Sequence, residues 1–88
     1  MNRQNAYDAE MIADMIKPLL AGHDPDVTSA VLAQLTALWL AGYVIRGDDR
    51  ETARMRKDLL SGHVSLIRRL IPVMHDRDIK PRLQADTH

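Results

Sequence analysis

The chain has no cysteine and no phenylalanine, and its only aromatic residues are one tryptophan and two tyrosines among 88 residues. Without cysteine, neither a disulfide nor a thiolate metal site can add to the stability of the fold. Without phenylalanine, the core must consist of leucine, isoleucine, valine, alanine and the five methionines. A chain of this length fits one domain, and so small a core supplies a net stability of about 3–5 kcal/mol.

The chain also has no net charge, because twelve basic residues balance twelve acidic ones. This balance argues against the strongly basic field of a nucleic-acid-binding protein. The two halves nevertheless differ. Residues 1–45 carry two basic and five acidic residues, a charge of −3, and residues 46–88 carry ten and seven, a charge of +3. Halves of opposite charge suit an antiparallel contact within one chain or between two copies.

One long apolar segment, Val27–Ile45, dominates the middle of the chain. From Ala30 onward, only Gln34 and Thr36 interrupt it before Tyr43. The segment is nearly long enough to cross a membrane, but its polar residues and charged flanks argue against a membrane helix. The N-terminus shows no apolar region of the kind that secretory signals contain. We therefore expect a cytoplasmic protein with no membrane partner.

The first helix is predicted over residues 6–21, where apolar residues from Met11 to Leu20 recur at helical period. Asn5 or an adjacent residue can cap its N-terminus. Pro18 cannot donate a backbone hydrogen bond, so we expect the helix to kink or end near Lys17. Gly22 is the expected stop.

The second helix is predicted over residues 25–44. Asp24 is the expected N-cap and Pro25 the first helical residue, a combination typical of helix starts. Gly42 is either a glycine within the helix at a close contact or the true C-terminal stop, with an extended connector after it. We favour a helix that continues to about Val44.

The third helix is predicted over residues 49–71, with Asp48 as N-cap and Pro72 as its end. Gly62 either lets another helix pass closely or breaks this helix, and the continuous apolar spacing across it favours one helix. The charged segment 75–88 is predicted to be a flexible tail, because Pro81 forbids a long helix there. The sequence thus predicts an all-α fold, a small three-helix bundle in a single domain over residues 1–74.

The second helix is apolar around most of its circumference, and a chain this small has too little material to cover it. We therefore expect a homodimer and, as function, a non-enzymatic protein-interaction or regulatory protein that self-associates through apolar helix faces. Whether Trp39 belongs to the core or to the interface stays open. The candidate association residues are Ala33, Leu35, Ala37, Leu38, Trp39 and Ala41.

Two other functions stay open from the sequence. A small enzyme or ligand-binding protein would need a site near His63. Acidic residues beside His23 and His75 could bind a metal, but helix capping and a solvated tail explain them more simply, and we expect neither a metal nor a cofactor. A nucleic-acid-associated regulatory protein would use the basic face of the third helix, namely Arg50, Arg54, Lys57, Arg68 and Arg69.

Overall fold

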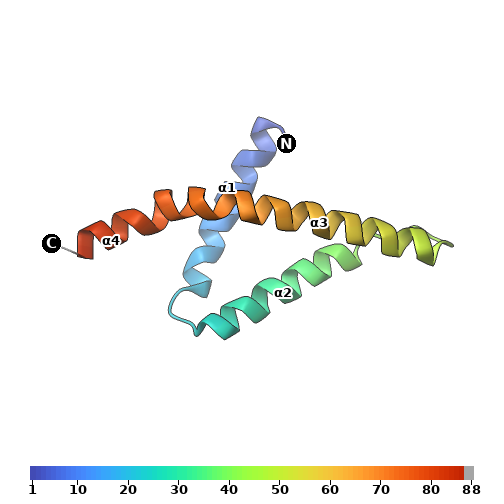
Figure 1. The fold of residues 1–88 in the computed structure, drawn as a ribbon, viewed down its shortest axis with the longest axis horizontal. Coiled ribbons are helices and arrows are strands. Elements are labelled where there is room, and N and C mark those ends of the chain that lie inside the picture. Colours follow the sequence, from blue (N-terminus) through green and yellow to red (C-terminus); the bar gives the residue numbers. More distant parts are fainter. Residues whose placement is uncertain (87–88) are drawn as a thin grey trace. The chain divides into compact units, whose positions relative to one another are not determined.

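A computed structural model describes residues 1–86, and in that part the chain is helical with no strand (Figure 1). The all-α class and the three long helices are therefore confirmed. No helix within residues 1–86 combines the length and the apolar character that crossing a membrane requires. The elements in chain order are α1 (Arg3–Leu20), α2 (Pro25–Ala41), α3 (Asp49–Met74), the π-helix η1 (His75–Ile79) and α4 (Lys80–Asp86).

The chain divides into two compact units, Met1–Ala37 and Leu38–His88, with the division inside α2. In the first unit, α1 begins after Asn2, whose side-chain oxygen accepts a 2.7 Å hydrogen bond from the Asn5 amide. The predicted cap at Asn5 is thus one helical turn too late. Pro18 lies inside α1, which continues to Leu20.

The turn between α1 and α2 forms as the sequence predicts. Gly22 has a φ of +79°, a left-handed conformation that glycine adopts without strain. Asp24 then caps α2: its side-chain oxygen accepts from the Asp26 amide at 2.9 Å, and its carbonyl accepts from the Thr28 amide at 3.1 Å. Pro25 is the first helical residue, as expected.

In the second unit, α2 ends at Ala41, so the predicted continuation to Val44 is wrong and Gly42 is the stop. The Gly42 amide is shared between the carbonyls of Leu38 and Trp39, and the Tyr43 amide donates to the Leu40 carbonyl at 3.1 Å. These bonds close the last turn, after which the chain leaves the helical conformation.

The helix α3 begins where predicted, with the Asp48 side chain accepting from the Glu51 amide at 2.9 Å. Gly47 supplies the preceding turn at a φ of +80°. Gly62 does not break α3, which confirms one continuous helix. A Cβ added at Gly62 would meet no atom within 4 Å. None of the described residues therefore packs closely against this glycine.

The predicted end of the third helix at residue 71 is wrong, because α3 passes through Pro72 to Met74. Proline removes one helical hydrogen bond. Three residues later the helical bonding is present again, because the His75 amide donates to the carbonyls of Ile71 and Pro72. The following π-turn ends at Ile79, two residues before Pro81, and the Lys80 amide donates to the His75 carbonyl. A wider turn relieves the collision between a proline ring and the preceding carbonyls.

The expectation that Pro81 forbids a long helix in this segment is therefore corrected, since residues 75–86 are helical in η1 and α4 and follow α3 without a break. Pro81 is the second residue of α4, which follows directly on η1. The flexibility of this segment stays a prediction. Thr87 and His88, the last two residues of the predicted tail, lie outside the described residues.

Candidate association surface

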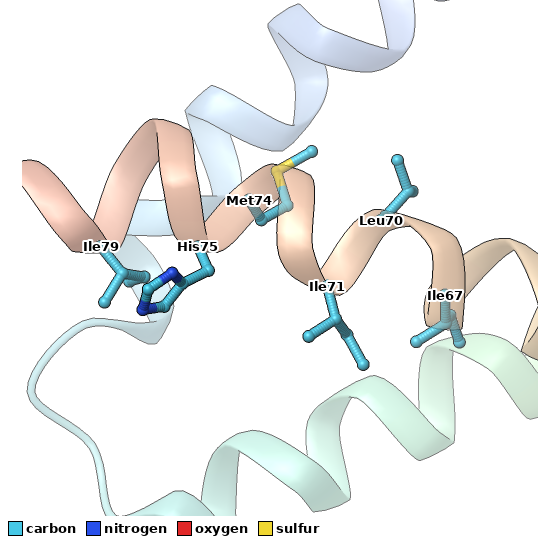
Figure 2. A pocket seen from close by; sticks show the side chains of 6 residues that line it. All are labelled: Ile67, Leu70, Ile71, Met74, His75 and Ile79. Atoms are coloured by element: carbon cyan, nitrogen blue, oxygen red, sulfur yellow. The ribbon is translucent and has the colours of Figure 1, made fainter.

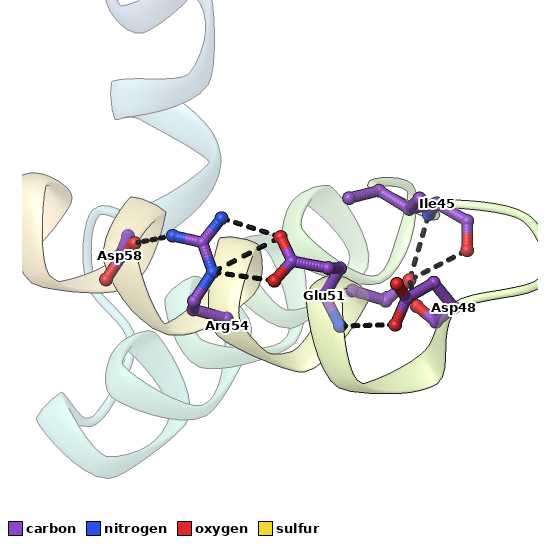
Figure 3. A network of polar contacts seen from close by, with 6 residues as sticks. Ile45, Asp48, Glu51, Arg54 and Asp58 are labelled. Atoms are coloured by element: carbon purple, nitrogen blue, oxygen red, sulfur yellow. Dashed lines mark hydrogen bonds and ion pairs between the residues drawn. The ribbon is translucent and has the colours of Figure 1, made fainter.

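The connection between α2 and α3 is held by a polar cluster around Thr52. Thr52 is 7% exposed and is the one buried residue in the described part of the chain. Its hydroxyl accepts a hydrogen bond from the Ile45 amide at 2.9 Å, and its own proton can go to the carbonyl of Asp48, at 2.9 Å, or of Ile45, at 3.2 Å. Figure 3 shows Ile45 and the Asp48 cap of α3 at this junction. The cluster fixes the extended connector against the first turn of α3.

Arg56 closes the C-terminal end of α2 from the neighbouring helix. Its Nε donates to the carbonyls of Leu40, at 3.2 Å, and Tyr43, at 3.0 Å, and its Nη2 donates to the carbonyl of Ala41 at 2.9 Å. The last carbonyls of a helix lack partners within it and carry partial negative charge. One guanidinium thus satisfies the carbonyls at which α2 stops. The sequence reasoning did not find this role.

Trp39 joins the same junction through its ring. The indole makes an edge-to-face contact with Tyr43, with ring centroids 5.9 Å apart, and a tilted contact with His63 at 5.0 Å. Trp39 is nevertheless 39% exposed. It therefore belongs partly to the packing within its own chain and partly to the surface. His63, the residue of the enzyme alternative, packs on this indole as an aromatic neighbour.

The predicted association residues are all on α2, distributed over more than one of its faces, and all of them are exposed. Leu35 is 50% and Leu38 is 72% exposed. The three alanines are spaced four residues apart, so they form one row of small side chains along which another helix can approach closely. The complete set is Ala33, Leu35, Ala37, Leu38, Trp39 and Ala41.

A second apolar surface, which the sequence reasoning missed, follows the C-terminal part of the chain. It surrounds an open hollow with a volume of about 480 Å³. Figure 2 shows side chains from α3 and η1 that follow one side of the helix, with Leu70 and Met74 on its other flank. We call the row on the first side the C-terminal stripe. Its members are Ile67, Ile71, His75 and Ile79.

The π-turn keeps the C-terminal stripe in line. In an uninterrupted α-helix a step of four residues rotates the side chain by about 40°, so three steps would carry Ile79 about 120° away from Ile67. A π-turn winds less per residue and brings Ile79 back toward Ile71. The four-residue spacing from Ile67 through Leu83 was the available sequence signal. Because we predicted a flexible tail from residue 75 onward, we did not recognise these residues as one apolar series.

The residues of the basic face lie on α3, but one of them is engaged in ion pairs. Arg54 donates to Glu51 at 2.6 Å and to Asp58 at 3.4 Å (Figure 3). The hydrogen bond and the charge of Arg54 lower the pKa of Glu51, and Glu51 in turn raises the pKa of Arg54. Arg50, Lys57, Arg68 and Arg69 are exposed. The acidic neighbours thus neutralise the centre of the basic row.

The two clusters of histidine and aspartate do not assemble a metal-binding group. Asp24 is engaged as the cap of α2. His75 contacts Asp76, with 3.5 Å between Nδ1 and Oδ1. Within residues 1–86, no three His, Asp or Glu side chains come together closely enough to hold a metal ion.

Comparison with known proteins adds nothing to this geometry. No protein-family model, no curated protein and no solved structure matches the chain.

Proposed function

We propose that this chain is a non-enzymatic protein-interaction or regulatory protein that self-associates as a homodimer through the apolar faces of its helices. The observation that carries the proposal is the lack of any buried apolar side chain in residues 1–86. Large apolar residues are exposed on every long helix, including Met15 and Leu19, each 71% exposed on α1. Contiguous apolar surface of this extent in a monomer marks a site of association.

The exposed area supports the same proposal. The chain has an accessible surface of 7744 Å² at a mass of 10.0 kDa. Two separate compact bodies of the sizes of the two units would together expose about 6300 Å². The chain exceeds that area by about 1400 Å². Two copies that covered this excess would bury about 2800 Å² in total, a typical area for an obligate homodimer.

The α2 surface has the composition that helix pairing needs. The alanine row permits close approach of a helix axis, and Leu38 and Leu35, about 100° and 160° around the helix from Ala37, supply apolar area on another face. Burying such a leucine side chain completely contributes about 1.5–3 kcal/mol. The proposal also places the protein in the cytoplasm. Disulfides are rare in that compartment, so a chain without cysteine is consistent with it.

Light scattering behind a size-exclusion column, over a dilution series, tests the proposal. We expect a mass of about twice 10.0 kDa at high concentration and a decrease toward 10.0 kDa on dilution. The double variant Leu35→Glu/Leu38→Glu should shift the midpoint to higher concentration. Gln34→Glu, an added charge at an exposed position of the same helix, is the matched control. A mass of 10.0 kDa at all concentrations, with helical circular dichroism, would contradict self-association.

A further inference from the structure

We propose that the second copy binds along the C-terminal stripe in the antiparallel direction, so that the stripe of one copy packs against the same stripe of the other. The inference rests on the proposed self-association, adds the C-terminal stripe to the α2 surface as a contact between the copies, and names the orientation of that contact. A twofold axis makes such a contact isologous, with the same patch contributed by both copies.

The stripe offers a continuous apolar strip to a partner helix. Ile67 is 46%, Ile71 is 62% and Ile79 is 44% exposed. Leu83, four residues beyond Ile79, is 54% exposed and extends the series into α4. Four apolar positions at this spacing form the ridge that packs into the groove of a facing helix. The single polar member is His75, which already contacts Asp76 on its own helix.

Two rows of charged residues flank the stripe, one on each side. Residues that follow a stripe position by one place form the first row, which contains Arg68, Asp76 and Lys80. Residues that follow a stripe position by three places form the second row, which contains Asp78 and Arg82. Arg69 lies about 200° around the helix from Ile67 and belongs to neither row.

The charges in these rows favour one orientation. In an antiparallel pair related by a twofold axis, the first row of one copy faces the first row of the other, and the same holds for the second row. Arg68 of each copy then lies beside Asp76 of the second copy when the stripes interdigitate. The contact occurs twice, once at each end of the paired segment, and each is a pair of opposite charges.

A parallel pair would lack the contact between Arg68 and Asp76. In that orientation the first row of one copy faces the second row of the other. Asp76 would then lie beside Asp78 of the second copy, a like charge, and Lys80 would lie between Asp78 and Arg82, with no net attraction. The charges therefore favour the antiparallel pair.

Charge reversal tests the orientation. We expect Arg68→Glu and Asp76→Arg each to weaken the dimer, raising its Kd by about tenfold at low salt, because two pairs change from attraction to repulsion. The double variant Arg68→Glu/Asp76→Arg restores opposite charges and should return the Kd to within about threefold of the natural value. The matched control is Arg69→Glu, the same charge change on the far side of the helix, which should leave the Kd unchanged.

The outcomes separate this inference from the proposed function. A natural chain that stays monomeric contradicts self-association itself. A natural chain that dimerises, with Arg68→Glu no weaker than Arg69→Glu or with no recovery in the double variant, overturns the antiparallel stripe and leaves self-association standing. The readout throughout is the Kd from sedimentation equilibrium, with circular dichroism as the check on folding.

Disulfide trapping gives an independent measurement, because the chain has no cysteine of its own. Ile67→Cys and Ile79→Cys copies, mixed and oxidised, should form the mixed disulfide in preference to either symmetric product, since an antiparallel pair brings these two positions near each other. A predominant symmetric Ile67→Cys product would indicate a parallel pair and overturn the inference. After proteolysis without reductant, mass spectrometry distinguishes the products by which cysteine-containing peptides the disulfide joins.

Discussion

Replacing Thr52 by valine should destabilise the chain more than its small change in volume suggests. Valine has nearly the shape of threonine but no hydroxyl, so the Ile45 amide would lose the acceptor at 2.9 Å that now satisfies it. Thr52 is 7% exposed, and water cannot readily replace the lost partner. An unsatisfied group in such a place costs about 1–3 kcal/mol. In a domain of this size each kcal/mol lowers the melting temperature by about 4–8 °C.

The control for this prediction is Thr52→Ser, which keeps the hydroxyl and loses one methyl group. That loss should cost about 0.8 kcal/mol. Urea unfolding followed by the fluorescence of Trp39 measures both variants, since the indole lies in the same junction against Tyr43 and His63. All samples are compared at one protein concentration because self-association adds to stability. A valine variant as stable as the serine variant would refute the role given to the hydroxyl.

Three further changes probe other parts of the second unit. Arg56→Met removes the three hydrogen bonds that close α2 and should cost about 1.5–3 kcal/mol in urea unfolding, against at most about 0.5 kcal/mol for the exposed control Lys57→Met. Gly62→Ala meets open space and should raise stability by about 1 kcal/mol through helix propensity while leaving the Kd of the dimer unchanged. A weaker dimer would mean that a second copy approaches this glycine. Glu51→Gln should lower the melting temperature at neutral pH, and the difference from the natural chain should disappear as the pH falls below 4.5, because the lowered pKa of Glu51 stabilises the fold only while the carboxylate is charged.

The parts of the fold that the sequence predicted correctly are those decided by neighbouring residues. The Asp48 and Asp24 caps, and the left-handed glycine Gly22, each act within a few residues of their own position. A helix start needs a side-chain acceptor beside the first free amides, and a sharp stop needs a residue that tolerates positive φ. Both requirements are readable from residue type alone.

The end of α2 was not predictable in this way, because the decisive group lies far along the chain. Residue type favoured a helix through Val44. The carbonyls at the end of α2 are instead satisfied by Arg56, which stands 15 residues after Ala41. The Thr52 hydroxyl similarly accepts a hydrogen bond from the amide of Ile45, seven residues earlier in the chain. Side chains at such separations are brought together by the turn at Gly47, and no local pattern marks either one as a helix cap.

The prolines misled the sequence analysis for a different reason. The rule that proline ends a helix describes a local cost, about 3 kcal/mol in a helix interior. It does not include the free energy that the residues on both sides of the proline gain by remaining helical. Around Pro72 and Pro81 the chain keeps a helical path from α3 to α4, with one π-turn between. The apolar series at intervals of four residues on both sides of Pro72 was the stronger signal.

Polar contacts and apolar surface play separate roles in this chain. Hydrogen bonds at the α2–α3 junction specify its conformation, but no buried apolar side chain in residues 1–86 supplies the hydrophobic free energy that ordinarily stabilises a domain. In the proposed dimer that free energy comes from pairing, at about 25 cal/mol for each Å² of apolar surface covered. Folding and association are then one equilibrium. The midpoint of thermal unfolding should therefore rise with protein concentration, and at a given concentration it should be lower in Leu35→Glu/Leu38→Glu, whose dimer is weaker. A midpoint independent of concentration in the natural chain would mean that its stability has another source.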